Sequence, residues 1–244
     1  MSDVNPFAPP QSATVFDDTS REVSLSPVDL YKRSFALIKE QYWLFLGISI
    51  VGVLIGSFIP FAILMGPMLV GIYLCFIDLE QGKKVEFGTL FKGFDLFVNA
   101  LVATLIAIGV SFIVIIPMVI LMMVGMFTML PRGGGNEMSV MLIPFMLLFY
   151  ALLFIAILLI QLPFLFAFQL IADKKLTGPE AVMTSFRGVR KNFVGCVLLA
   201  VSVGVASLLA TLACYVPVFF LTPLNFGVFY LAYRDVFGPT PMQR

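Results

Sequence analysis

Four long stretches of this chain contain no Asp, Glu, Lys or Arg, and short charged segments separate them. The charge-free stretches are 41–77, 96–131, 138–172 and 192–233. A transmembrane helix needs about 20 mostly apolar residues, and each stretch exceeds that length. Their apolar residues run continuously rather than alternating in segments of about ten residues, which argues against an outer-membrane barrel. We therefore predict an all-α, polytopic transmembrane helical bundle.

Amphipathic segments carrying basic side chains precede the apolar stretches. From Val28 to Tyr42, apolar residues recur every three or four positions, and basic residues lie off that stripe. The segment 180–193 repeats the pattern, with a stripe of Val182, Phe186, Val189 and Phe193, and a shorter version covers 87–94. Such helices suit a membrane surface, and we predict that their basic side chains contact lipid headgroups. The candidate headgroup-binding residues are Lys32, Arg33, Lys39, Lys92, Arg187, Arg190 and Lys191.

The order of these features repeats three times along the chain. In each repeat, a surface segment is followed by an apolar stretch, an aliphatic-Pro pair and a second apolar stretch. The pairs are Ile59-Pro60, Ile116-Pro117 and Val216-Pro217, and the units end near Asp78, Asp173 and Asp235. We interpret the chain as three tandem units, each an amphipathic surface helix plus a helical hairpin. The six predicted spans lie near 43–59, 61–77, 96–116, 145–172, 194–214 and 217–233.

The basic residues predict the orientation of the hairpins. Every Lys and Arg except Arg132 lies in a tail or borders a predicted span, so hairpins place them all on one face. The positive-inside rule makes that face cytoplasmic. We expect an inner-membrane protein with both termini in the cytoplasm. Residues 1–26 resemble a disordered cytoplasmic tail rather than a cleavable signal peptide, and 27–244 form a single transmembrane domain.

The middle unit leaves an alternative open. Its apolar stretches, 96–130 and 140–172, are each too long for one straight crossing. They tilt, break at Pro117 or Pro163, or carry apolar helix beyond the bilayer. If each is instead a hairpin, the chain has eight spans. The absence of a central turn signal in 138–172 favours six.

Composition excludes most catalytic chemistry. Hydrophobic residues make up 60% of the 244 positions and charged residues 12%, so little polar surface is present, and there is no histidine. Triads with histidine, HExxH zinc sites and haem ligation by histidine are thereby excluded. Cysteine spacing indicates neither a zinc site nor a disulfide framework, and a net charge of +1 gives no reason to expect nucleic-acid binding. We predict a protein that is not an enzyme and has no cofactor or metal.

Two features could still carry chemistry. Asp78, Asp173 and Asp235 end their units, and ion pairing with nearby basic residues is favoured over a divalent-ion site. Polar residues within the apolar stretches either form interhelical hydrogen bonds or line a substrate path. The residues that would line such a path are Asn99, Gln161, Gln169 and Asn225.

These patterns leave two functions to weigh. The first is a structural, lipid-organising or accessory membrane subunit without a catalytic site. The alternative is a small-molecule or lipid transporter, because internal repeats and broken helices are typical of transporters. The expected partners are membrane lipids with anionic headgroups at the cytoplasmic face. A protein partner or a second copy of the chain is left open.

Several short motifs resemble a known group of membrane proteins. They are Gly66-Pro67 with Gly71, Phe87 to Phe94, Ile171-Ala172-Asp173, Ala232 to Phe237, and the opening Asn5 to Pro10. Together they resemble an uncharacterised family of bacterial multi-pass integral membrane proteins that is similar to the membrane domain of some glycerophosphodiester phosphodiesterases. The likeness covers most of 27–238 and implies six helices without an established activity. The sequence does not contain the phosphodiesterase catalytic domain.

Overall fold

The fold is helical throughout the part of the chain that can be described. The structure is a computed structural model that describes residues 20–58, 63–129, 137–214 and 216–238. In these ranges every regular element is an α-helix or a 3₁₀-helix, and no strand occurs. This confirms the predicted all-α fold. Arg132 and the Asn5 to Pro10 motif lie outside the described residues.

Three successive units make up the chain, as the sequence predicts. The first contains α1 (Pro27–Ile38), η1 (Lys39–Gln41), α2 (Tyr42–Phe58) and α3 (Met65–Glu80). The second contains η3 (Phe87–Leu96), α4 (Phe97–Met129), α5 (Glu137–Gln161), η4 (Leu162–Phe164) and α6 (Ala167–Lys174). The third contains α7 (Gly178–Lys191), α8 (Phe193–Leu212) and α9 (Val216–Phe237). Each unit is a short leading helix followed by a helical hairpin.

Five helical segments of the described chain are long and apolar enough to cross a membrane, as in a multi-pass membrane protein. They are Pro27–Ser57, Phe87–Phe127, Pro144–Lys174, Phe193–Leu212 and Val216–Phe237. The predicted span near 61–77 corresponds to α3, which has only 16 residues. At about 1.5 Å per residue it reaches about 24 Å, less than the roughly 30 Å of a hydrocarbon core.

The middle unit contains two long helices, not four short ones. α4 continues through Pro117 as one helix of 33 residues, and α5 is one helix of 25 residues. The eight-span alternative is therefore wrong. Of the two breaks considered, the one at Pro163 occurs, since α5 ends at Gln161 and the chain continues through η4 into α6, whereas α4 does not break at Pro117. Proline removes a backbone donor and crowds the preceding turn, so a helix ends or bends at such a residue.

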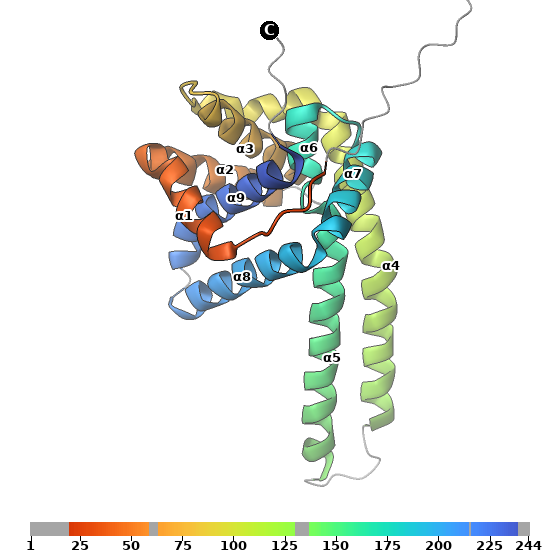
Figure 1. Cartoon of the computed structure of the whole chain (residues 1–244). Coiled ribbons are helices and arrows are strands. Elements are labelled where there is room, and N and C mark those ends of the chain that lie inside the picture. The colour runs from red at the N-terminus through yellow and green to blue at the C-terminus, as the bar shows by residue number, and fades with distance from the viewer. Residues whose placement is uncertain (1–19, 59–62, 130–136, 215, 239–244) are drawn as a thin grey trace, which may run out of the picture.

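The hairpin of the second unit projects from the rest of the molecule. α4 and α5 pack against each other and run down the view in Figure 1, whereas α8 and α9 run across it. We call the α4/α5 hairpin the arm. Many apolar side chains of the arm are exposed, including Ile113, Phe127 and Leu147. A surface so apolar is typical of contact with lipid. The sequence predicted the arm's helices but not their direction.

The core lies where α3 meets the first and third units. α3 contributes the buried residues Met68, Ile72 and Phe76. The Phe76 ring lies 4.6 Å from the ring of Phe45 on α2 and 5.4 Å from that of Tyr230 on α9, measured between centroids. α3 is thus covered by protein on several sides, which fits its shortness.

A glycine allows η3 to lie directly on α3. A Cβ atom built on Gly71 would overlap the carbonyl oxygen of Leu90, which belongs to the backbone of η3. Gly93 has the same relationship with the carbonyl oxygen of Pro67. Two helices whose backbones approach this closely require glycine at the contact. Gly71 is one of the residues that carry the family resemblance, and packing explains its presence.

Candidate functional site

The seven candidate basic residues lie on or beside three different helices. Lys32, Arg33 and Lys39 belong to α1 and η1, and Lys92 belongs to η3. The other three, Arg187, Arg190 and Lys191, lie together in the last turns of α7. All seven side chains are exposed. α7 therefore holds the densest group.

Arg33 forms ion pairs, and α1 is attached to protein along one face. The guanidinium nitrogens of Arg33 donate to both carboxylate oxygens of Asp235, at 2.8 and 3.0 Å. The Tyr31 hydroxyl donates to the side-chain oxygen of Asn225 at 2.8 Å, and the Ser34 hydroxyl donates to the carbonyl of Leu224 at 2.9 Å. α1 is thus held against α9, and only part of its apolar stripe remains available to a membrane.

A buried charge cluster joins the ends of the three units. Arg234 on α9 approaches Asp173 on α6 at 2.9 Å and Glu80 on α3 at 2.7 Å. The Tyr233 hydroxyl donates to Asp173 at 2.7 Å, and the Arg234 Nε donates to the Tyr230 hydroxyl at 3.0 Å. The Arg234 and Asp173 side chains are 9% and 5% exposed. Removing charges from water is costly unless each finds a partner, and these do.

The three aspartates that end the units all form ion pairs, as the sequence favoured. Asp173 pairs with Arg234 and Asp235 with Arg33, while Asp78 lies 3.6 Å from Lys83. Across residues 20–58, 63–129, 137–214 and 216–238, no group of three His, Cys, Asp or Glu side chains is arranged to hold a metal ion. The charge cluster around Arg234 connects α3, α6 and α9.

α7 is built to turn a small-residue face toward the protein. It begins with a capping box, in which Thr177 and Glu180 each accept a hydrogen bond from the other's backbone. Its buried positions are Gly178, Ala181, Ser185, Gly188 and Val189. A Cβ on Gly178 would lie 2.7 Å from the carbonyl oxygen of Asn99, so α7 lies close to the first turns of α4.

The expected apolar stripe of α7 therefore points partly outward. Val189 is 3% exposed, but Phe186 and Phe193 are 45% and 48% exposed. The four residues of the predicted stripe therefore do not all meet the same surroundings. Small residues take the inner face because they permit closer helix packing. The outer edge of α7 thus combines Phe186 with Arg187 and Arg190, and Phe193, the first residue of α8, continues this edge.

Three grooves follow one another along this edge. The strap groove, about 560 Å³, lies between 22–25 and the α7–α8 junction and includes Arg190 and Phe193. The α5 groove, about 290 Å³, has Arg190, Phe193 and Phe186 on one side and Leu159, Leu162 and Pro163 on the other. The α4 groove, about 330 Å³, is lined by apolar residues only: Ile106, Val110, Pro163, Phe164, Pro179, Val182, Met183 and Phe186. Shared residues make the three grooves neighbours.

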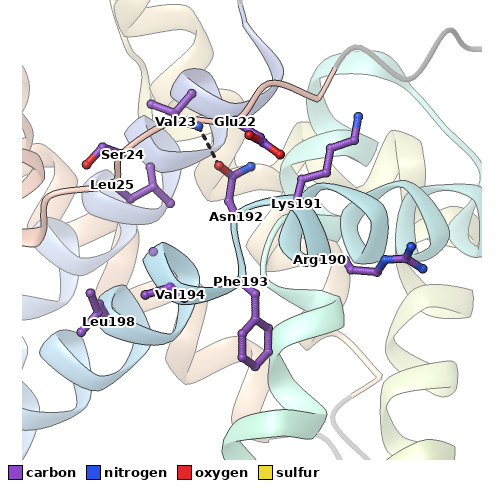
Figure 2. A pocket seen from close by; sticks show the side chains of 11 residues that line it. Glu22, Val23, Ser24, Leu25, Arg190, Lys191, Asn192, Phe193, Val194 and Leu198 are labelled. Atoms are coloured by element: carbon purple, nitrogen blue, oxygen red, sulfur yellow. Dashed lines mark hydrogen bonds between the residues drawn. The ribbon is translucent and has the colours of Figure 1, made fainter.

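An N-terminal strap, residues Ser20–Leu25, forms one wall of the strap groove (Figure 2). The Val23 N–H donates to the side-chain oxygen of Asn192 at 2.7 Å, and the Asn192 amide donates to the carbonyl of Arg21 at 2.8 Å. The Arg21 N–H donates to the carbonyl of Val236 at 2.8 Å. Leu25 is buried. Residues 20–25 belong to the segment expected to be a disordered tail, but these contacts hold them against the ends of α7 and α9.

The four polar residues considered for a substrate path are in different places. Asn225 accepts from Tyr31 and donates to Ser207 at 3.4 Å, as expected of an interhelical hydrogen bond. Gln169 is buried in the core, while Gln161 is exposed at the end of α5. None of the four lines the grooves described above. A shared path through these residues has no support in the described chain.

Comparison with known proteins does not assign this arrangement to a family. No family model, no curated protein and no solved structure matches the chain. The likeness to the membrane domain of glycerophosphodiester phosphodiesterases therefore stays a prediction from the sequence. Function has to be inferred from the geometry alone.

Proposed function

We propose that this chain is a multi-pass protein of the cytoplasmic membrane that binds anionic phospholipid headgroups and organises lipid or a partner protein there. The observation that carries the proposal is the outer edge of α7, where exposed Phe186 accompanies exposed Arg187 and Arg190, and exposed Phe193 follows at the start of α8. A helix edge with aromatic and basic side chains suits the boundary between headgroups and acyl chains.

Electrostatics gives this edge its lipid preference. Each basic residue close to an anionic membrane surface contributes about 1 kcal/mol to binding, and salt screens that attraction. Within the described residues, no acidic side chain pairs with Arg187 or Arg190. Their charges are therefore available to phosphate groups, in contrast to that of Arg33.

The contacts between units support a common cytoplasmic face. The Arg234 cluster joins the ends of α3, α6 and α9, and the pair between Arg33 and Asp235 adds α1. The hydrogen bond from Arg21 to Val236 brings the two ends of the described chain together. Basic segments at these ends then share one side of the membrane. The positive-inside rule assigns that side, and both termini, to the cytoplasm.

Lipid preference tests the proposal directly. The purified full chain, in a mild detergent, is titrated with phosphatidylglycerol or with phosphatidylcholine, and bound lipid is counted by native mass spectrometry. We expect tighter binding of phosphatidylglycerol, with a preference that falls as salt rises. Equal binding of the two lipids at every salt concentration would contradict the proposal.

The proposal assigns no catalysis to the chain. Hydrolysis of phosphate esters usually requires a base with a pKa near neutral, a bound metal or an activated nucleophile. We expect no headgroup or phosphate release when magnesium, manganese or calcium is added to the protein in anionic lipid. Turnover that disappears in an Asp173→Asn variant would overturn this part of the proposal.

A further inference from the structure

We infer that the chain holds one anionic diacyl phospholipid in a defined site, with its phosphate at Arg190 and its two acyl chains in the α5 and α4 grooves. This inference rests on the proposed function and adds a fixed position and a stoichiometry to it. It distinguishes a built site from a charged surface that many lipids share.

Arg190 occupies the position that a headgroup would take. Its side chain lies at the rim shared by the strap groove and the α5 groove. In Figure 2 it extends away from the strap, while the Phe193 ring points down from the α7–α8 junction. A planar guanidinium with several donors binds phosphate in a bidentate manner. Arg187, one turn earlier on α7, lines none of the three grooves.

Two apolar grooves lead away from this rim, one for each acyl chain. Phe186 and Pro163 line both grooves and so lie between them. The α5 groove is apolar apart from Arg190, and the α4 groove is apolar throughout. A soluble phosphate compound has no apolar chain, so it would gain no binding energy from the apolar walls of the two grooves. A lipid with two chains attached to one phosphate can occupy both grooves and the rim at once.

The exposed face of α5 extends the first groove along the arm. Leu159, Ile155, Leu152 and Leu148 are all exposed. Their spacing of four, three and four residues places them on one side of the helix. From Leu159 to Leu148 this apolar face covers about 17 Å at about 1.5 Å per residue, close to the length of an extended acyl chain. An acyl chain that starts beside Leu162 therefore has a continuous surface to follow.

Two arginines on the same helix supply a matched test. The full chain is compared with its Arg190→Gln and Arg187→Gln variants by native mass spectrometry during a phosphatidylglycerol titration. We expect one saturable lipid for the unmodified chain. Loss of the charged hydrogen bonds should weaken that lipid by more than tenfold in Arg190→Gln, whereas Arg187→Gln removes only a nearby surface charge and should weaken it by no more than about fivefold.

A second pair of variants tests the grooves without altering charge. Leu159→Trp fills the α5 groove, whereas Leu147→Trp makes the same change at an exposed position of the arm that lines none of the grooves. We expect the saturable lipid to be lost only in Leu159→Trp. Added glycerol phosphate, which has the phosphate but no acyl chains, should not displace the bound lipid.

The outcomes separate this site from the broader proposal. Equal weakening by Arg187→Gln and Arg190→Gln would overturn the defined site and leave a charged lipid-binding surface. Unchanged binding in Leu159→Trp, or displacement by glycerol phosphate, would also overturn it. If the unmodified chain shows no preference for phosphatidylglycerol over phosphatidylcholine, the proposed function fails as well. Should Leu159→Trp not fold, the two arginine variants still decide the matter.

Discussion

The guanidinium of Arg234 on α9 lies 2.9 Å from the carboxylate of Asp173 on α6, and both side chains are almost completely buried. Arg234 also meets Glu80 of α3, so one side chain joins the last helices of all three units. Such a contact fixes the ends of the three units relative to one another. The helix α7 begins only a few residues after Asp173, at Gly178.

Removal of Arg234 should destabilise the fold strongly. Arg234→Ala leaves Asp173 buried without its cation, and breaking a buried pair in this way costs about 3–5 kcal/mol. Arg33→Ala serves as the control, because that pair is more exposed and such pairs contribute about 0–1 kcal/mol. The measurement is the free energy of unfolding in mixed micelles titrated with a denaturing detergent. Equal losses in the two variants would show that the cluster does not hold the units together.

Gly71 should not tolerate a side chain, whereas Gly109 should accept one. In Gly71→Ala the new methyl group meets the backbone of Leu90, and overpacking of this kind costs about 1–3 kcal/mol or more. A Cβ on Gly109 meets nothing within 4 Å, so Gly109→Ala should stabilise α4 by up to about 1 kcal/mol. Thermal melting of both variants in the same detergent checks the contrast. A stable Gly71→Ala variant would contradict the close packing of η3 on α3.

The strap should be released when Asn192 loses its amide. Both polar atoms of that side chain bond to the strap, so Asn192→Ala removes two of the hydrogen bonds that hold it. We expect trypsin to cleave after Arg21 faster in this variant than in the unmodified chain. Ser24→Ala, an exposed change within the strap, is the control and should leave the cleavage rate unchanged. If Asn192→Ala is cleaved no faster, Asn192 does not fix the strap.

Sequence patterns predicted the elements of this fold better than their directions. The charge-free stretches predicted the helices and the three units. Of the aliphatic-Pro pairs, Val216-Pro217 lies at the start of α9, but α4 continues through Ile116-Pro117, and Ile59-Pro60 lies outside the described residues. The projection of the arm could not be predicted, because lipid and protein both satisfy an apolar side chain. For the same reason the sequence did not show that α3 is a core helix, whose apolar residues pack against protein.

The site shows a similar division. The basic residues of α7 were predicted, but the small residues that face the protein were not. Gly178, Ala181, Ser185 and Gly188 recur at spacings of three, four and three, and this small-residue stripe was the available signal. No local signal joins Arg234 to Asp173, because the two residues are 61 positions apart in the sequence. Pairings of that kind depend on the tertiary fold.

The central claim is that the outer edge of α7 lies at an anionic membrane surface. The most direct test places a single cysteine at Met183, an exposed residue of that helix, in a chain whose three cysteines have been replaced. An environment-sensitive fluorophore on this cysteine is then followed in vesicles containing phosphatidylglycerol. We predict strong quenching by lipid-attached spin labels and weak quenching by aqueous iodide, compared with the same fluorophore at exposed Gly82 in the turn after α3. Iodide quenching as strong at Met183 as at Gly82 would contradict the account.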